Sequence, residues 1–465
     1  MTMTRLRSLA YDVVTRRDGL AGWKPHRRRF RTLSRSGPRE IERHALDALR
    51  RLLVHAYATA PYYRETWKAA GFVPSLTTTV EDVRRLPLVT KRELRERKMD
   101  FVSERFDPAA LRLDYTGGTT GVQTAFYRDT GCSVARFGRQ WGVLERCGYR
   151  PGDKRALIWG AHADLRPPDA TGRLKQRFRQ FGCAEAVACC TVMRREEMLD
   201  YHRRLQAFRP SVLYGYPNAI EQFARFIDRE GLARVRVARV ICTAETLRPS
   251  QRALFQERFG GEVFNLYCSR EHGCVGFECE RHDGFHVDAG SVLVEILRSG
   301  RAAHPGESGE IVTTDLLNYG MPLIRYATGD LAMPSSSPCG CGCALPTFSA
   351  LHGRVADTLY RADGTPVAGL MLTDLFWEQP SITDAQFVQS DIASLDVHVV
   401  LQPGAPATIR EDIVNEVRSI MGTQIAIRVR VVADIPRNPT SGKYQEVVCA
   451  VPAQTLAALA SEGIL

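Results

Sequence analysis

The chain has 465 residues, an apolar fraction of 44% and a formal net charge of +11. This length predicts two or more domains, and no apolar run approaches the length of a membrane span. The amino terminus, Met1 to Val14, lacks the apolar stretch of a secretory signal, so we expect a cytoplasmic protein. The positive charge predicts a solvated basic face rather than a nucleic-acid interface, because no nucleic-acid-binding motif accompanies it.

Helices are predicted first along the chain. Leucines and alanines spaced by three and four residues predict a helix over 39–60, which Pro61 ends. Thr90 and Glu93 have capping-box spacing and predict the start of another helix. From about residue 110, apolar strands alternate with helices, which indicates an α/β fold with a largely parallel sheet. We expect strands at 156–159, 212–214 and 237–242, and helices at 197–208, 219–230 and 249–259.

The pattern changes after residue 285. Alternating strands are predicted at 292–297 and 309–314, and a small α+β unit begins after Arg354. We therefore predict a large amino-terminal domain of residues 1–354 and a small carboxyl-terminal domain of residues 355–465.

A threonine- and glycine-rich loop within Asp114–Arg128 carries the most informative motif. Glycines let backbone N–H groups face an anion, and hydroxyls add donors that can surround a polyphosphate. Val122 and Gln123 follow Gly121, so the loop lacks the lysine of a Walker A motif. Because a Thr/Gly turn between strands is often only a turn, the segments downstream decide its meaning.

Three further segments carry groups suited to nucleotide chemistry. Tyr267 and Glu271 could stack a base and hold Mg²⁺ beside a phosphate. Asp330 follows a glycine turn, where a carboxylate can hydrogen-bond a ribose diol. Lys443, in a polar loop, could neutralise charge on a transferring phosphoryl group. Each also has an ordinary alternative as a strand-end, surface or turn residue.

In this order and at these separations, the segments resemble the acyl-adenylate-forming superfamily, and more narrowly its phenylacetate–CoA ligase branch. Further support comes from residues 55–64, 86–91, 214–217, 244–247 and 264–271. The resemblance implies a large adenylation domain of layered sheets and helices, followed by a small, mobile α+β domain.

The resemblance also implies roles for individual residues. The ATP phosphates would be held by Thr116, Gly117, Gly118, Thr119, Thr120 and Gly121. The adenine pocket would be lined by Ala244, Glu245 and Tyr267, and Ser269 would face the phosphates. The ribose hydroxyls would be bound by Asp330 and Arg354. Glu271 would hold Mg²⁺, and Asp357 would be the hinge between domains. The catalytic residues would be Lys443, Glu271 and Thr116.

The implied reaction has two steps. Attack of a carboxylate on the α-phosphate of ATP gives acyl-AMP and pyrophosphate, and Lys443 and Mg²⁺ stabilise the transition state. The small domain then rotates and admits the thiol of coenzyme A. A same-class alternative passes the acyl group to an amine or to a carrier-protein thiol.

Two alternatives lie outside this class. A basic, zinc-containing nucleic-acid-binding protein is disfavoured by the acidic residues around the Cys/His segment, such as Glu278 and Asp283. An inactive interaction module is disfavoured because Lys443, Glu271 and Asp330 are all present. The oligomeric state stays open, with a homodimer as one option.

The acid is not specified by the sequence. Candidates for lining its pocket are Trp141, Trp159, Gly160, Tyr214 and Tyr216. They favour an aromatic or arylacetic acid, although sheet packing explains the same residues.

The chain departs from the family in three places. Cys268 stands where the family usually has glycine, and Ala356 replaces a common acidic residue at the hinge. Residues 359–375 match the family poorly, which bears on the thiol step because this segment helps to shape the thiol site.

The thirteen cysteines argue against a disulfide framework in a cytoplasmic protein. One group nevertheless suggests a metal site, because Zn²⁺ prefers four N and S ligands. Spacing alone leaves core cysteines as an alternative, since Cys-Gly-Cys is tighter than the usual zinc spacing. The resemblance to zinc-binding members of the branch implies a structural site. Its ligands would be Cys279, His286, Cys339 and Cys341, with His282 and Cys343 in reserve.

Overall fold

The computed structural model describes residues 11–115 (without 14 and 17), 124–159, 185–189, 195–354, 358–369, 372, 376, 379, 381–436, 446–452 and 455. The chain divides into two units. The first contains residues up to 247, 251–328 and 333–350, and the second contains 248–250, 329–332 and the chain from 351 onward. The domain division at 354/355 stays a prediction.

Helices form most of the described chain before residue 110. They are α2 (Trp23–Leu33), α3 (Pro38–Thr59), α4 (Pro61–Ala69), α5 (Val80–Arg84) and α6 (Lys91–Glu96), with 3-10 turns η1 (Lys98–Phe101) and η2 (Pro108–Ala110). The predicted helix over 39–60 is α3, whose apolar face buries Leu49, Leu52 and Leu53. The predicted capping box opens α6, because the side chains of Thr90 and Glu93 each accept the other's backbone N–H.

A mixed sheet of twelve strands runs through the described residues, in the order β11-β10-β12-β13-β14-β9-β8-β7-β6-β5-β3-β4. Its strands are β3 (Arg155–Trp159), β4 (Glu185–Cys189), β5 (Val212–Gly215), β6 (Arg239–Thr243), β7 (Glu262–Ser269), β8 (Gly273–Phe277), β9 (Phe285–Val287), β10 (Val292–Arg298), β11 (Arg301–Ala302), β12 (Gly309–Asp315), β13 (Tyr326–Pro334) and β14 (Thr347–Arg354). Strands β3 to β7 pair in parallel, whereas β7, β8 and β9 pair antiparallel. The largely parallel sheet expected from the sequence is thus confined to five strands. The turn over 270–272 is too short for a parallel crossover.

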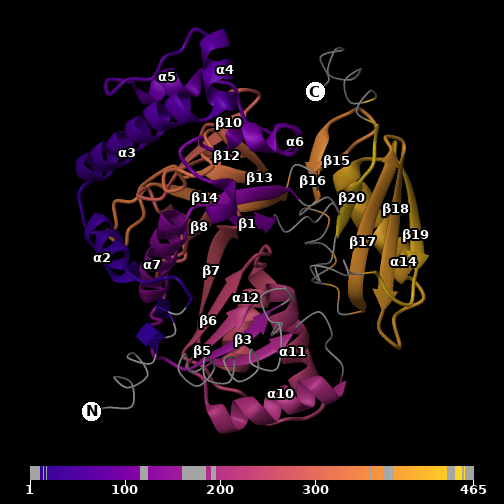
Figure 1. Ribbon diagram of the computed structural model, residues 1–465. Coiled ribbons are helices and arrows are strands. Elements are labelled where there is room, and N and C mark those ends of the chain that lie inside the picture. Colours follow the sequence, from indigo (N-terminus) through magenta and orange to yellow (C-terminus); the bar gives the residue numbers. More distant parts are fainter. Residues whose placement is uncertain are drawn as a thin grey trace. The chain divides into compact units, whose positions relative to one another are not determined.

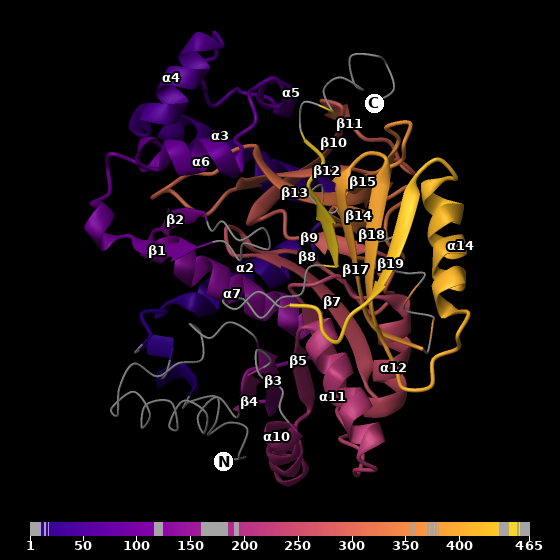
Figure 2. The same cartoon turned by 90° about the vertical axis from the view of Figure 1, so that its right-hand side faces the viewer.

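Helices cover both faces of the parallel strands, as Figures 1 and 2 show. Helices α10 (Arg195–Phe208), α11 (Pro217–Arg229) and α12 (Pro249–Phe259) share a core cluster with Leu213 and Val240. Helices α2 and α7 (Thr130–Arg146) share the opposite cluster with Tyr214 and Ile241. Because neighbouring residues enter different cores, these strands are apolar on both faces.

The second unit is an α+β unit, as predicted. It contains the hairpin β15 (Thr358–Tyr360) and β16 (Pro366–Ala368), together with β17 (Ile382–Asp391), β18 (Ser394–Leu401), α14 (Ile409–Met421), β19 (Ala426–Val431) and β20 (Val447–Cys449). The last four strands form a sheet in the order β19-β18-β17-β20, and α14 packs its Ile413 and Val417 into their core. In the part of the chain that the structure describes, no helix has both the length and the apolar character needed to cross a membrane.

Candidate nucleotide and metal sites

The predicted phosphate loop lies between the strands of a hairpin, β1 (Arg112–Tyr115) and β2 (Ala125–Arg128). Residues Thr116–Gly121 themselves lie outside the described residues, so their role stays a prediction. The base of the loop is held by Asp114, whose carboxylate pairs with Arg128 and with Arg270 Nη1 at 3.4 Å. Arg270 belongs to the turn that carries Glu271, so this ion pair joins the phosphate loop to that turn.

The turn over residues 270–272 connects β7 to β8. The hydroxyl of Ser269 accepts the backbone N–H of His272 at 3.1 Å and lies 3.1 Å from His272 Nδ1. Burial and the nearby Arg136 guanidinium lower the pKa of His272 to about 3, which keeps its imidazole neutral. Its Nε2 lies 3.0 Å from Thr313 Oγ1, so both ring nitrogens have partners. These contacts fix the position of the turn.

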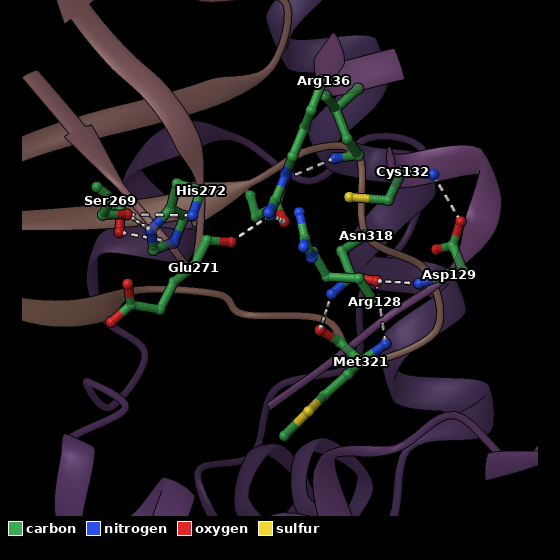
Figure 3. Close-up of polar contacts among 12 residues, drawn as sticks. Arg128, Asp129, Cys132, Arg136, Ser269, Glu271, His272, Asn318 and Met321 are labelled. Carbon is green, nitrogen blue, oxygen red and sulfur yellow. Dashed lines mark hydrogen bonds and ion pairs between the residues drawn. The ribbon is translucent and has the colours of Figure 1, made fainter. Parts of the chain in front are cut away.

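The side chain of Arg136 on α7 holds the same turn by binding the main-chain carbonyls of the turn, as Figure 3 shows. Its guanidinium donates to the carbonyl oxygens of Arg270 and Glu271 and pairs with Asp315 at 2.5 Å. Arg136 and Asp315 are both buried. The carboxylate of Glu271 points away from Arg136, and its Oε1 accepts the hydroxyl of Tyr326 at 3.2 Å. Glu271 is therefore held by its backbone and oriented by Tyr326.

Arg136 is a residue that the sequence analysis missed. The available signal was an arginine among apolar residues such as Cys132 and Ala135, in a segment for which the sequence analysis predicted no particular helix. An arginine is almost never fully buried without a charged partner, but its partner Asp315 lies far away in sequence.

Three of the residues predicted to bind the nucleotide lie on β6 and β7 or directly after them. Ala244 has a φ of 69°, a left-handed conformation that is strained for a residue with a side chain. The carboxylate of Glu245 accepts the backbone N–H of Asn218 at 3.2 Å, in the first turn of α11. Tyr267 is buried on β7, with its ring edge-on to Phe348 at 6.1 Å between centroids.

The remaining residues of the predicted site are less fully described. Asp330 lies on β13, and Arg354 is the last residue of β14. Asp357 and Lys443 lie outside the described residues, so the hinge and the catalytic lysine stay predictions.

The residues predicted to line the acid pocket separate into two groups. Trp159 stacks on Tyr214 with ring centroids 5.8 Å apart, and it also contacts Tyr216 at 4.9 Å. Trp141 packs between other aromatic rings, and its indole N–H donates to the hydroxyl of Tyr11 at 2.8 Å. Gly160 lies outside the described residues. The structure thus brings three of the five candidates into one aromatic group.

The four preferred metal ligands, Cys279, His286, Cys339 and Cys341, come together in the structure. Cys279 follows β8, His286 is the central residue of β9, and both other cysteines lie between β13 and β14. Their ligand atoms all lie within 4.8 Å of one another. The two reserve candidates have other partners: Cys343 donates to the carbonyl of Ser34, and His282 Nδ1 lies 3.3 Å from Glu278 Oε2.

Three thiols and one imidazole match the donor set of a structural zinc site. The backbone N–H groups of Arg281 and Cys343 donate to the sulfurs of Cys279 and Cys341, each at 3.4 Å, which favours thiolates. Burial, together with the neighbouring Cys339 and Cys341 thiols, raises the pKa of Cys279 to about 12. A bound divalent cation would reverse this effect by stabilising the thiolates, so these residues fit a metal ion.

Sequence comparison relates the chain to proteins named phenylacetate-coenzyme A ligase and to Protein CapK. Residues 359–449 match the CapK C-terminal domain. The chain is 26% identical over 305 residues to phenylacetate-coenzyme A ligase of Pseudomonas putida, covering 63% of this chain and 66% of that ligase. It is 27% identical over 327 residues to the Thermus thermophilus ligase of the same name, covering 67% and 70%. It is 24% identical over 371 residues to Protein CapK of Staphylococcus aureus, covering 78% and 80%.

The fold is that of the acyl-adenylate-forming enzymes. The structure of 2-hydroxyisobutyryl-CoA ligase in the postadenylation state has a TM-score of 0.73 at 19% identity, covering 92% of this chain and 93% of that one. The amide bond synthetase McbA from Marinactinospora thermotolerans has a TM-score of 0.51 at 17% identity, covering 72% and 67%. The sequence similarity is to proteins named phenylacetate-coenzyme A ligase and to Protein CapK. The resemblance inferred from the motifs is therefore confirmed.

Proposed function

We propose that this protein is an AMP-forming ligase that activates a carboxylic acid with ATP and then transfers the acyl group to the thiol of coenzyme A. The main structural support is the turn that carries Glu271. This turn is fixed by buried polar contacts and is joined to the base of the phosphate loop through Arg270 and Asp114. Similarity to named CoA ligases supports the reaction class.

Each part of the proposed site has a separate task. Thr116–Gly121 bind the ATP phosphates, and Glu271 holds Mg²⁺ beside them. When bound, the ion neutralises charge on the phosphates during in-line displacement. Asp330 and Arg354 bind the ribose hydroxyls, and Asp357 serves as the hinge. Lys443 stabilises the charge that develops when the carboxylate attacks.

The aromatic group of Trp159, Tyr214 and Tyr216 supports a flat or aromatic acid as the substrate. A pyrophosphate-release screen across aryl, arylacetic, fatty and amino acids tests both the reaction and the acid class. Pyrophosphate release that depends on an aromatic acid is the expected result. If no acid supports release, the proposed function is wrong.

An amine or a carrier-protein thiol is the alternative acyl acceptor. The observation in its favour is the fold that the chain shares with the amide bond synthetase McbA. The poor match expected for residues 359–375 is corrected by the comparison, since this segment lies within the match to the CapK C-terminal domain. The same screen, repeated with and without coenzyme A and with amines, separates the acceptors. Formation of the acyl-CoA is the result expected from the main proposal.

Replacing Asp330 with alanine should raise the KM for ATP at least tenfold. The ribose hydroxyls would lose a charged acceptor, and hydrogen bonds to charged groups contribute roughly 1.5–3 kcal/mol each. Asp363→Ala is the matched control, since Asp363 is an exposed carboxylate that accepts hydrogen bonds from the backbone and side chain of Thr365 in its own turn. Calorimetry that finds equal ATP affinity in the Asp330 variant and the parent would rule out the ribose role.

We also propose that Cys279, His286, Cys339 and Cys341 bind one structural Zn²⁺. The ion would connect the β8–β9 region to the segment between β13 and β14, and so would close a long loop. Its role would be in folding, because a metal that binds only the folded state adds its binding energy to stability.

Protein purified without chelators should therefore contain about one Zn²⁺ per chain. The Cys339→Ser variant should lose the ion and unfold at a lower temperature. Cys343→Ser should keep it, because the thiol of Cys343 donates to Ser34. Elemental analysis and thermal unfolding check these results. If freshly purified parent protein contains no metal, the zinc proposal is wrong and the four residues are ordinary core residues.

A further inference from the structure

Two cysteines face each other across the strands that flank the Glu271 turn. Cys268 on β7 and Cys274 on β8 are register partners in an antiparallel pair, directly after a register shift between Tyr267 and Cys268. Directly opposite residues in such pairs have Cα atoms about 4.5–5.5 Å apart, which lies within the range that a disulfide requires. Both are free cysteines in the structure, and their thiols share a hydrogen bond.

The pair differs chemically from the buried cysteines of the first unit. Cys132, Cys147 and Cys242 are almost fully buried, whereas Cys268 and Cys274 both keep partial exposure. The hydrogen bond with Cys274, and a second with Thr243, lower the pKa of Cys268, while the pKa of Cys274 is raised. One thiol of the pair is thus set to react first, and the other is placed to resolve it.

The position of the pair connects it to both parts of the proposed site. Only residues 269–273 separate the two cysteines, and Glu271 is the middle residue of that segment. Tyr214 belongs to the core cluster against which both cysteines pack. The pair is therefore close in sequence to Glu271 and shares a cluster with a residue predicted to line the acid pocket.

We propose that Cys268 and Cys274 form a redox-active dithiol that closes to a disulfide and slows adenylation by fixing the turn of Glu271 in a different position. The dithiol itself does not depend on the proposed function. Its effect on rate rests on the proposed function.

The oxidant we propose is a peroxide. The Cys268 thiolate attacks one peroxide oxygen, which gives a sulfenic acid and releases hydroxide. The Cys274 thiol then attacks the sulfenic sulfur and passes its proton to the leaving hydroxyl, so the S–S bond forms and the sulfenic oxygen leaves as water. The two thiols lose two electrons and two protons in total, and hydrogen peroxide becomes two molecules of water. A thiol reductant reverses the change by exchange.

A shift of the turn follows from bond lengths. Two hydrogen-bonded sulfurs must approach to about 2.05 Å to form the disulfide. That movement draws β7 and β8 together directly beside the turn. Arg136 of α7 and Thr313 of β12, which contacts His272, continue to hold the turn. Glu271 lies between these opposing constraints, so we expect its carboxylate to move.

Peptide mass spectrometry tests the disulfide directly. Trypsin cleaves after Arg258, Arg270 and Arg281, so the two cysteines fall in separate peptides, 259–270 and 271–281. After peroxide treatment and digestion without reductant, the two peptides should appear linked, and fragmentation should place the link at Cys274 rather than Cys279. The linked species should be absent from Cys274→Ala. If the treated parent contains no linked peptide, the dithiol proposal is overturned.

Pyrophosphate release measured before and after oxidation tests the effect on rate. In the parent, oxidation should lower the rate at least tenfold, and dithiothreitol should restore it. In Cys268→Ala and Cys274→Ala, the oxidised and reduced rates should agree within twofold. Cys449→Ser, which removes a partly exposed cysteine of the second unit, should remain sensitive. If the parent protein forms the disulfide but still adenylates at the rate of the dithiol form, the proposed switch is overturned. A reduced parent that activates no acid would overturn the proposed function, and the mass measurement would still decide the dithiol.

Discussion

Replacing Lys443 with alanine is expected to lower the rate of acyl-AMP formation by roughly 10²–10³-fold, by analogy with the loss of a single oxyanion-hole donor. The reason is that the lysine would act only where negative charge develops, during attack on the α-phosphate. The variant should fold like the parent, because Lys443 lies in a polar loop predicted to be exposed. Single-turnover measurement of acyl-AMP checks the rate, and circular dichroism checks the fold.

The two half-reactions provide the control for this prediction. Given preformed acyl-AMP and coenzyme A, the Lys443 variant should form the thioester at nearly the parent rate, because the lysine would have rotated away by then. An equal loss in both steps would indicate a damaged fold or a general binding role. Acyl-AMP formation at the parent rate would show that another residue supplies the charge.

The sequence predicted helix boundaries well where capping residues or prolines mark them. The capping box at Thr90 and Glu93 and the proline that follows α3 depend on neighbouring residues alone, and the structure confirms both. The sheet was only partly predicted. An alternation of strands and helices indicates parallel pairing. The antiparallel pairing of β7, β8 and β9 depends instead on short turns that reverse the chain direction.

The candidate site shows a similar division. The four Cys/His residues were selected from motif similarity, and the structure brings their ligand atoms together. The clamp on Glu271 could not be predicted, because Arg136 and Asp315 are separated by 179 residues and neither belongs to a recognisable motif. Pairs of this kind depend on which strand lies beside which helix, and local patterns do not specify that arrangement.

Replacing Arg136 with methionine is expected to lower the free energy of unfolding by roughly 3–5 kcal/mol, because it leaves the carboxylate of Asp315 buried without its cation. It should also slow adenylation by the protein that remains folded, and raise the Mg²⁺ concentration needed for half-maximal rate. The physical reason is that the carbonyls of Arg270 and Glu271 lose their donor, so the turn is held less firmly. Chemical denaturation and a Mg²⁺ titration of the rate measure the two effects.

Arg139→Met is a matched control on the same helix. Arg139 lies one turn further along α7 and pairs with the buried Asp288 at 2.6 Å, so its loss should cost similar stability. Its described contacts are with Asp288 and the ring of Phe30 rather than with the turn over 270–272. The folded fraction of this variant should therefore keep the parent's Mg²⁺ dependence. If both variants change the Mg²⁺ dependence equally, Arg136 stabilises the fold without positioning Glu271. The proposed role of the Arg136–Asp315 ion pair in positioning the metal-binding turn would then be wrong.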